Sequence, residues 1–225
     1  MASFLLITQL SSPTQSTREQ AKPRYLTPAR FALSTFPMTP DFAQSFPLRT
    51  ARVHEVCGPS AASFACVCAS KAQGSVIWIR EHWRPETLNP LGLSPFFDPA
   101  KLLIAQVKDQ TEGLAVAEEA LRDGATPLVI LEISQPMGLI QGRRLQLSAK
   151  AGKSTGLCLI PDGMGSNAAE SRWHAAPIFD PFSAAGDSTL QRYELIKNKS
   201  GTLGSWHVRW DTASRRLHLV SATGE

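Results

Sequence analysis

The residues of this chain best placed for phosphate chemistry lie in one turn between a strand-like run and a helix of small residues. Residues 58–65 read Gly-Pro-Ser-Ala-Ala-Ser-Phe-Ala, in the place of the phosphate-binding loop G-x-x-x-x-G-K-[ST]. In that loop the glycines let backbone N–H groups wrap the phosphates, the lysine neutralises charge and the hydroxyl ligates Mg²⁺. Gly58 keeps the first glycine of the pattern and is followed by Pro59. Ser63 replaces the second glycine, Phe64 replaces the lysine and Ala65 replaces the hydroxyl residue. If the fold is a nucleotide-binding one, we therefore expect a degenerate nucleotide loop without a cofactor; the alternative is an ordinary Gly-Pro turn before a helix.

A second stretch matches the last half of the same pattern more closely. Residues 151–155 read Ala-Gly-Lys-Ser-Thr, but the first glycine of the pattern would fall at Leu147. The stretch also follows a predicted helix and precedes a predicted strand, which reverses the order that a phosphate loop requires. We interpret Gly152 instead as a left-handed residue that ends a helix.

No other set of residues has the spacing of a catalytic or metal site. The four cysteines contain no C-x-x-C pair and the five histidines no H-x-x-x-H pair, and no Ser/His/Asp set is recognisable. We interpret the cysteines as small apolar residues in a reducing compartment. The sequence thus predicts no metal site and no enzyme activity.

The elements that must position the degenerate loop alternate between strands and helices. Apolar runs bounded by turn signals predict strands. Runs of small apolar residues and end signals predict helices, such as the capped start at residues 109–112 and the stop at Gly124. The predicted strands are 52–57, 75–79, 102–107, 127–133 and 156–160, and the predicted helices are 61–72, 114–122 and 142–151. This alternation is typical of an α/β fold with a mostly parallel sheet flanked by helices. Shorter predicted strands follow at 171–178, 189–196, 206–210 and 217–220, and they indicate a C-terminal antiparallel β extension.

Composition divides the chain into an arm and a domain. Residues 1–48 hold six prolines without a sustained period, so we predict a mostly irregular N-terminal arm. Residues 49–225 form one domain, with an α/β core at 49–162 and the β extension at 163–225. The formal charge of +4 belongs to residues 1–52, which hold six Lys or Arg and two Asp or Glu. The neutral remainder argues against a dedicated nucleic-acid binder.

Targeting signals are weak. The N-terminal apolar run is short, no charge precedes it, and no stretch approaches the ~18 apolar residues of a membrane span. We expect a cytoplasmic protein with no membrane contact.

In the order of these features, residues 46–160 resemble the ATPase core of the RecA-like superfamily. The Gly58-Pro59 turn after a strand is similar to the start of the RecA loop G-P-x-x-x-G-K-T. Residues 79–82 are similar to the segment that carries the water-activating glutamate, and residues 128–133 to the second acidic strand end. The resemblance implies that Glu81 and Glu132 are vestigial acidic positions, left without a nucleotide to serve.

Residues 50–220 resemble more closely the ImuA family, RecA-like accessory factors of bacterial mutagenic DNA repair, in its short alphaproteobacterial form. The resemblance rests on residues 53–59, 117–121 and 171–173, and above all on the unusual phrase at 89–99, Asn-Pro-Leu-Gly-Leu-Ser-Pro-Phe-Phe-Asp-Pro. It implies a role in translesion synthesis during the SOS response. The implied partner is an ImuB-type Y-family polymerase-like protein, with RecA and an error-prone replicative-type polymerase as further candidates.

We therefore expect a non-catalytic RecA-fold interaction protein. Aromatic and arginine side chains anchor interfaces, and the candidate partner or DNA contacts are Trp83, Phe96, Phe97, Arg172, Trp173, Trp206, Arg209, Trp210, Arg215 and Arg216. The alternation of Trp206, Val208 and Trp210 is equally compatible with one core-facing side of a strand. Three alternatives stay open, namely a single-stranded DNA-binding repair accessory protein with weak or indirect DNA contact, a residual nucleotide sensor, and a cell-division inhibitor.

Overall fold

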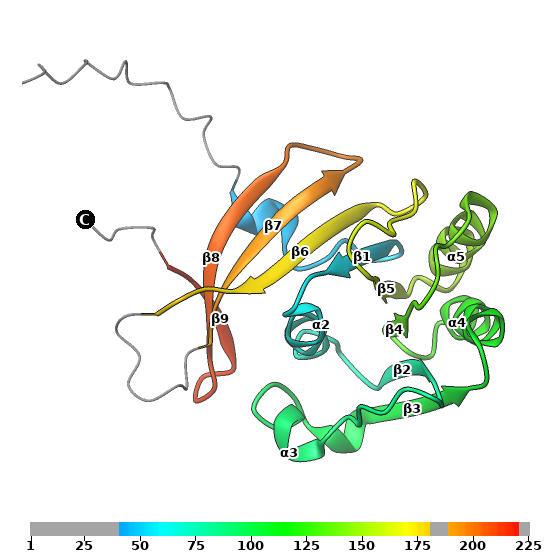
Figure 1. The fold of residues 1–225 in the computed structure, drawn as a ribbon, viewed down its shortest axis with the longest axis horizontal. Helices are drawn as coiled ribbons and strands as arrows, with labels where there is room; N and C mark the ends of the chain where they lie inside the picture. The colour runs from blue at the N-terminus through cyan, green and yellow to red at the C-terminus, as the bar shows by residue number, and fades with distance from the viewer. Residues whose placement is uncertain (1–40, 181–188, 221–225) are drawn as a thin grey trace, which may run out of the picture. The chain divides into compact units, whose positions relative to one another are not determined.

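The computed structural model describes residues 41–180 and 189–220, in which nine strands form one sheet (Figure 1). The sheet order is β3-β2-β4-β5-β1-β6-β7-β8-β9. The strands are β1 Val53–Cys57, β2 Val76–Glu81, β3 Leu102–Val107, β4 Leu128–Glu132, β5 Thr155–Leu159, β6 Ser171–Pro177, β7 Leu190–Asn198, β8 Gly204–Asp211 and β9 Arg216–Val220. Neighbours from β3 to β6 pair in parallel, and β6 to β9 pair in antiparallel. This confirms the predicted mostly parallel sheet with a C-terminal antiparallel extension.

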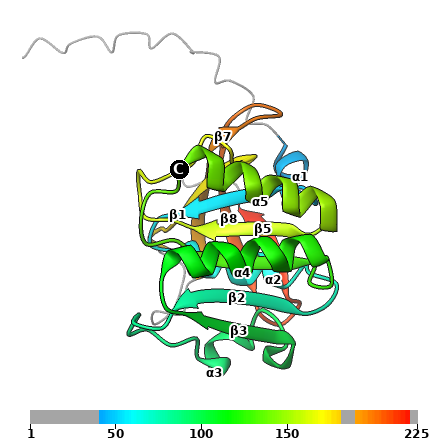
Figure 2. The same ribbon diagram turned by 90° about the vertical axis from the view of Figure 1, so that its right-hand side faces the viewer.

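The helices lie on both faces of this sheet. They are α1 Phe42–Ser45, α2 Ala61–Ala69, α3 Pro90–Leu93, the 3-10 helix Pro99–Lys101, α4 Gln110–Asp123 and α5 Leu139–Gly152. Figure 2 shows α4 and α5 side by side across one face of the parallel strands. On the other face, α2 lies between the parallel strands and the curved β6–β8 hairpins (Figure 1).

Two hydrophobic cores follow from this layering, because each central strand is buried on both faces. Trp78 and Ile130 point to the α2 side, where they join the core that includes Phe64. Ile79 and Leu131, the alternate residues of the same two strands, point to the side covered by α4 and α5. Continuous apolar runs are what such doubly covered parallel strands require.

Helix α4 begins and ends at the predicted signals. The Asp109 carboxylate accepts a hydrogen bond from the Glu112 N–H at 3.0 Å, and the Glu112 carboxylate accepts one from the Lys108 N–H at 2.7 Å. At the other end Gly124 has φ 75°, the left-handed conformation that closes many helices. Local side-chain chemistry thus sets both ends of this helix.

The end of α5 differs from the prediction in one residue. Lys153, with φ 55°, is the left-handed residue, and Gly152 is still helical. A Cβ on Gly152 would lie 2.0 Å from the Leu121 carbonyl oxygen, so the glycine is needed for the close approach of α5 to the end of α4. The stretch 151–155 does run from helix into strand, as expected of a segment that is not a phosphate loop.

The last residues that we assigned to the N-terminal arm contribute to the core. Phe42 and Phe46 stack with ring centroids 5.2 Å apart, and Phe42 also meets the Trp206 ring at 5.3 Å. Together with Leu48 they are buried in the α2-side core. The rest of the predicted arm, residues 1–40, lies outside the described residues. No helix in the described part of the chain is long and apolar enough to cross a membrane.

Candidate functional site

The Gly58 turn connects β1 to α2 through three residues. Gly58 has φ 91°, and a Cβ there would lie 2.5 Å from the Ala175 carbonyl oxygen of β6. The Ser60 N–H donates to that same carbonyl at 3.0 Å, and the Ala61 N–H donates to the Gly58 carbonyl at 3.0 Å. The turn thus directs two N–H groups at the protein's own carbonyls, and β6 packing by itself accounts for the glycine.

The three substituted positions of the pattern lie inside helix α2 rather than in an open loop, because the helix already begins at Ala61. The Ser63 hydroxyl accepts a hydrogen bond from the Gln191 side-chain amide of β7 at 2.8 Å. Phe64 and Ala65 have no exposed surface. Ser63 and Phe64 therefore contact the β extension, and Ala65 belongs to the core on the α2 side of the sheet.

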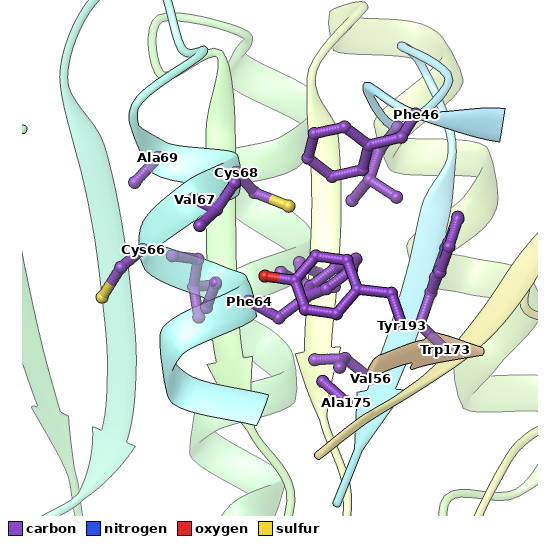
Figure 3. Close-up of a cluster of buried hydrophobic side chains, with 14 of the residues drawn as sticks. Phe46, Val56, Phe64, Cys66, Val67, Cys68, Ala69, Trp173, Ala175 and Tyr193 are labelled. Atoms are coloured by element: carbon purple, nitrogen blue, oxygen red, sulfur yellow. The ribbon is translucent and has the colours of Figure 1, made fainter. Parts of the chain in front are cut away.

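Phe64 lies at the centre of an aromatic cluster (Figure 3). Its ring centroid is 4.8 Å from that of Tyr193, 5.5 Å from that of Trp173 and 5.8 Å from that of Phe46. Such contacts, together with the area that an aromatic ring buries, stabilise a core by about 3–5 kcal/mol, the amount lost when a buried Phe is truncated. The position that the pattern G-x-x-x-x-G-K-[ST] assigns to lysine is therefore a core position in this chain.

A groove of about 560 Å³ remains at the carboxyl ends of the parallel strands. In open α/β sheets this edge is where ligands bind. The groove is lined by Gly58, Pro59, Ala61, Ala62, Trp78, Arg80, Arg84, Glu86, Thr87, Leu88, Glu132, Ile133, Leu159, Ile160 and Pro161. It thus brings together the predicted turn and one of the two predicted acidic positions.

The Glu132 carboxylate is fully engaged in this groove. One oxygen accepts a hydrogen bond from the Trp78 indole N–H at 2.8 Å. The other lies 3.5 Å from an Arg80 nitrogen and 3.2 Å from an Arg84 nitrogen. The Glu132 and Arg80 side chains are only 10% and 7% exposed. Two guanidinium groups already neutralise this carboxylate, so it is not poised to hold a cation.

Glu81 does not share the groove with Glu132. Along β2, Glu81 lies on the same face as Ile79, which is the face that α4 covers. Trp78 and Arg80 lie on the opposite face, toward the groove. The Glu81 side chain is 6% exposed, and one of its carboxylate oxygens has no hydrogen-bond partner in the described structure. The two acidic positions that the resemblance pairs therefore lie on opposite faces of the sheet.

These residues do not fit a magnesium-bound nucleotide. Phe64 cannot approach a phosphate without leaving the core, and Glu132 could ligate Mg²⁺ only by giving up its two arginines. No group of three or more His, Cys, Asp or Glu side chains among the described residues could hold a metal ion. Burial also raises the pKa of the Cys57 and Cys66 thiols to about 12, so neither is a reactive thiolate.

Three of the candidate contact tryptophans lie in the interior rather than on a surface. Trp173, Trp206 and Trp210 are 0%, 7% and 4% exposed. The Trp210 indole N–H donates to the Pro95 carbonyl at 3.2 Å, and its ring stacks on Phe96 at 5.2 Å. These rings contact the protein's own core, contrary to the expectation of partner or DNA contacts, because their strands turn one face onto α2 and the 83–97 loop.

The remaining candidate contacts are divided between core and surface. Phe97 is buried, and Arg172 forms a 2.8 Å ion pair with the wholly buried Glu55. Arg209 pairs with Asp180 at 2.6 Å, and Arg215 donates to the Ser94 carbonyl at 3.2 Å. The candidate side chains that face solvent are those of Trp83, at 57% exposure, of Arg215 and Arg216, and in part that of Arg209, at 43%.

Sequence reasoning missed the arginines of the groove. The sequence patterns singled out neither Arg80 nor Arg84. Period-two alternation was the available signal, because Val76, Trp78 and Arg80 share one face of a buried strand. A charged residue at such a position needs a carboxylate partner, and Glu132 at the end of the adjacent β4 was the nearest candidate.

No protein-family model matches the chain. The chain is similar to the protein named Protein ImuA from two strains of Caulobacter vibrioides, NA1000 / CB15N and ATCC 19089 / CIP 103742 / CB 15, with 26% identity over 159 residues in each case. The match covers 64% of this chain and 64% of each relative, so it spans slightly less than two thirds of the relatives' length. The crystal structure of the RadB recombinase has a similar fold, with a TM-score of 0.54 and 14% identity over 75% of this chain and 90% of that chain.

Proposed function

We propose that this chain, an ImuA-like protein with a RecA-like fold, is a non-catalytic interaction protein of damage-induced mutagenesis. The observation that supports the proposal is that residues at the pattern's phosphate and metal positions make structural contacts. Phe64 packs among Tyr193, Trp173 and Phe46, and Glu132 pairs with Arg80 and Arg84. The scaffold keeps the shape of a nucleotide-binding fold while its phosphate and metal positions stabilise the core.

The family resemblance supplies the proposed partner. ImuA-like proteins work with an ImuB-type Y-family polymerase-like protein in translesion synthesis, and we propose the same association in the cytoplasm for this chain. A scaffold that binds no nucleotide would have the same conformation with and without ATP, so its affinity for the partner would not change with ATP. Single-stranded DNA binding has less support, because three of the four candidate tryptophans that would stack on bases, Trp173, Trp206 and Trp210, are buried.

Calorimetric titration of the purified ImuB-type protein into the full chain tests the proposal. We expect saturable binding with the same dissociation constant in the presence and absence of ATP with Mg²⁺. A Glu86→Ala variant is a suitable control for a surface change at the groove. The Glu86 carboxylate lies 3.9 Å from an Arg80 nitrogen, but the Glu86 side chain is 73% exposed. Binding that requires ATP, or no binding at all, would overturn the proposed function.

A further inference from the structure

The outward face of α5 carries an unusual set of exposed aliphatic side chains. Leu139, Ile140 and Leu147 are 44%, 75% and 68% exposed. With Arg143 they occupy neighbouring positions of one helical stripe, because residues three, four, seven and eight apart share a face. The opposite stripe of the helix, with Leu145 and Ala149, is buried against the sheet. Figure 2 shows α5 on the outside of the molecule, beside α4.

The charge of this face has a single sign. Helix α5 contains no Asp or Glu between residues 139 and 152. Arg144 pairs with Glu118 of α4 at 2.7 Å. Arg143, Lys150 and the nearby Lys199 form no ion pair with any carboxylate in the described residues. Exposed aliphatic residues flanked by unpaired cations complement a ligand that is apolar in its centre and anionic at its edges.

A groove of about 450 Å³ lies along this stripe. Its lining comprises Leu139, Arg143, Gln146, Leu147, Asn167, Ala168 and Lys199, with no acidic residue among them. One wall is therefore α5, and the other is the segment that leads from β5 to β6, with the end of the β7 hairpin beside it.

The second wall is held by hydrogen bonds from two half-buried side chains, those of Gln146 and Lys197, and from the exposed Lys199. The Gln146 side-chain amide donates to the carbonyls of Val53 at 2.8 Å and Ala168 at 3.1 Å. The Lys199 ammonium donates to the same Ala168 carbonyl at 2.7 Å, and the Lys197 ammonium donates to three further carbonyls of the segment, including that of Ala169 at 2.7 Å. A groove with fixed walls loses little conformational entropy when it binds.

We propose that this groove, between α5 and residues 167–168, binds an amphipathic helix of a partner protein, with leucine-type residues on its inner stripe and carboxylates on its flanks. Helix-in-groove recognition uses apolar anchors at such spacings. The 14 residues of α5 extend about 21 Å, enough to contact about four turns of a partner helix. The exposed anchors are aliphatic and not aromatic, so they favour a peptide over stacked bases. The inference deepens the proposed partner-binding function, on which it rests, by giving a surface and a partner chemistry.

Fluorescence anisotropy with a labelled peptide of about 16 residues tests the inference, since shorter isolated helices are marginal in water. The peptide carries Leu at i, i+3 and i+7 and Glu on both sides of that stripe, and it is titrated with the full chain. We expect saturable binding that weakens at least about tenfold for a peptide with Lys in place of Glu, and similarly for one with Ser in place of Leu.

Two variants of the chain locate the binding site. Leu147→Asp should weaken binding of the Glu peptide at least about tenfold, because it places a carboxylate among the apolar anchors. Arg143→Glu should weaken the Glu peptide and strengthen the Lys peptide. The matched controls are Leu203→Asp, a 56% exposed leucine between β7 and β8, and Lys101→Glu; neither should change the affinity. Thermal melting by circular dichroism checks that each variant is folded.

The inference is overturned if the Glu peptide does not bind, or if Leu147→Asp and Arg143→Glu have no larger effect than the controls. A labelled single-stranded oligonucleotide that displaces the peptide would assign the groove to DNA instead. A concentration-dependent doubling of mass that Leu147→Asp abolishes would assign it to a second copy of the chain. If the ImuB-type protein binds the chain and its affinity is unchanged by both variants, the inference fails and the proposed function stands.

Discussion

At the scale of single residues, Phe64 decides whether the nucleotide motif can be restored. A lysine at this position would place a charge among Trp173, Tyr193 and Phe46 in a region with no solvent exposure. We predict that the double change Phe64→Lys/Ala65→Thr lowers the free energy of unfolding by at least about 3 kcal/mol and does not create ATP binding. Urea unfolding followed by tryptophan fluorescence measures the loss. The conservative change Phe64→Leu should cost less than about 2 kcal/mol; a stable double variant that binds ATP would contradict this account.

His54 makes the stability of the fold depend on pH. Its Nε2 faces the Arg49 carbonyl at 2.9 Å and must carry the proton, so its Nδ1 accepts from the Ser171 hydroxyl at 2.6 Å. Burial lowers the pKa of His54 from 6.5 to about 4. The neutral form is favoured in the folded state, so the stability that it contributes is complete above pH 6.5 and is lost as the pH falls toward 4.

We predict that the wild-type chain loses about 2 kcal/mol more than a His54→Gln variant when the pH falls from about 7 to about 5. Urea unfolding at both pH values gives, for each protein, the slope of the free energy of unfolding against pH. Comparing the two slopes removes the contribution of the carboxylates that both proteins share. Equal slopes in the two proteins would contradict the assignment of a neutral, buried imidazole.

At the scale of elements, the Gly58 turn packs closely against β6. We predict that Gly58→Ala lowers the free energy of unfolding by roughly 2–4 kcal/mol, since it adds a contact of 2.5 Å to the Ala175 carbonyl oxygen as well as a strained φ of 91°. Gly163 is the matched control, because its φ is 79° and a Cβ there meets nothing within 4 Å. Gly163→Ala should therefore lose only the backbone part, about 1 kcal/mol. Equal losses in urea unfolding would show that the approach to β6 is not tight.

The ion pairs of Glu132 join β2, β4 and the loop after β2. Removing the carboxylate leaves Arg80 with a side chain that is 7% exposed and only a distant 3.9 Å contact to Glu86. We predict a loss of about 3–5 kcal/mol for Glu132→Ala. The control Glu86→Ala, on the exposed side of the same arginine, should lose less than about 1 kcal/mol. Unfolding in guanidinium chloride measures both losses. Equal losses of the free energy of unfolding in the two variants would contradict the structural role of Glu132.

Local patterns predicted the elements far better than the contacts between them. The apolar runs at β2 and β4, the Asp109 cap and the Gly124 stop each act over a few residues, so they can be read directly from the sequence. The Arg80–Glu132 pair joins residues 52 positions apart, and such pairing depends on which strands become neighbours. The same limit applies to Trp206 and Trp210, because alternation identifies one face of a strand but not what covers it.

At the scale of the whole molecule, we propose that this RecA-like fold works without nucleotide chemistry. The sheet order, the Gly58 turn and the groove at the strand ends are all present. Phe64 and Ala65, at the lysine and hydroxyl positions of the phosphate-loop pattern, are buried in the core, so we expect the fold to be stable without a ligand. A ligand that bound the native state would raise its apparent stability, and we predict that ATP with Mg²⁺ leaves the melting temperature unchanged.

Calorimetric titration of ATP with Mg²⁺ into the full wild-type chain tests the central claim most directly. With ligand raised to about 1 mM, the weak end of ordinary substrate affinities, we predict no saturable heat. Micromolar, Mg²⁺-dependent binding that persists in Glu86→Ala and disappears in a folded Glu132→Gln variant would show that the groove is still a nucleotide site, and it would contradict the account.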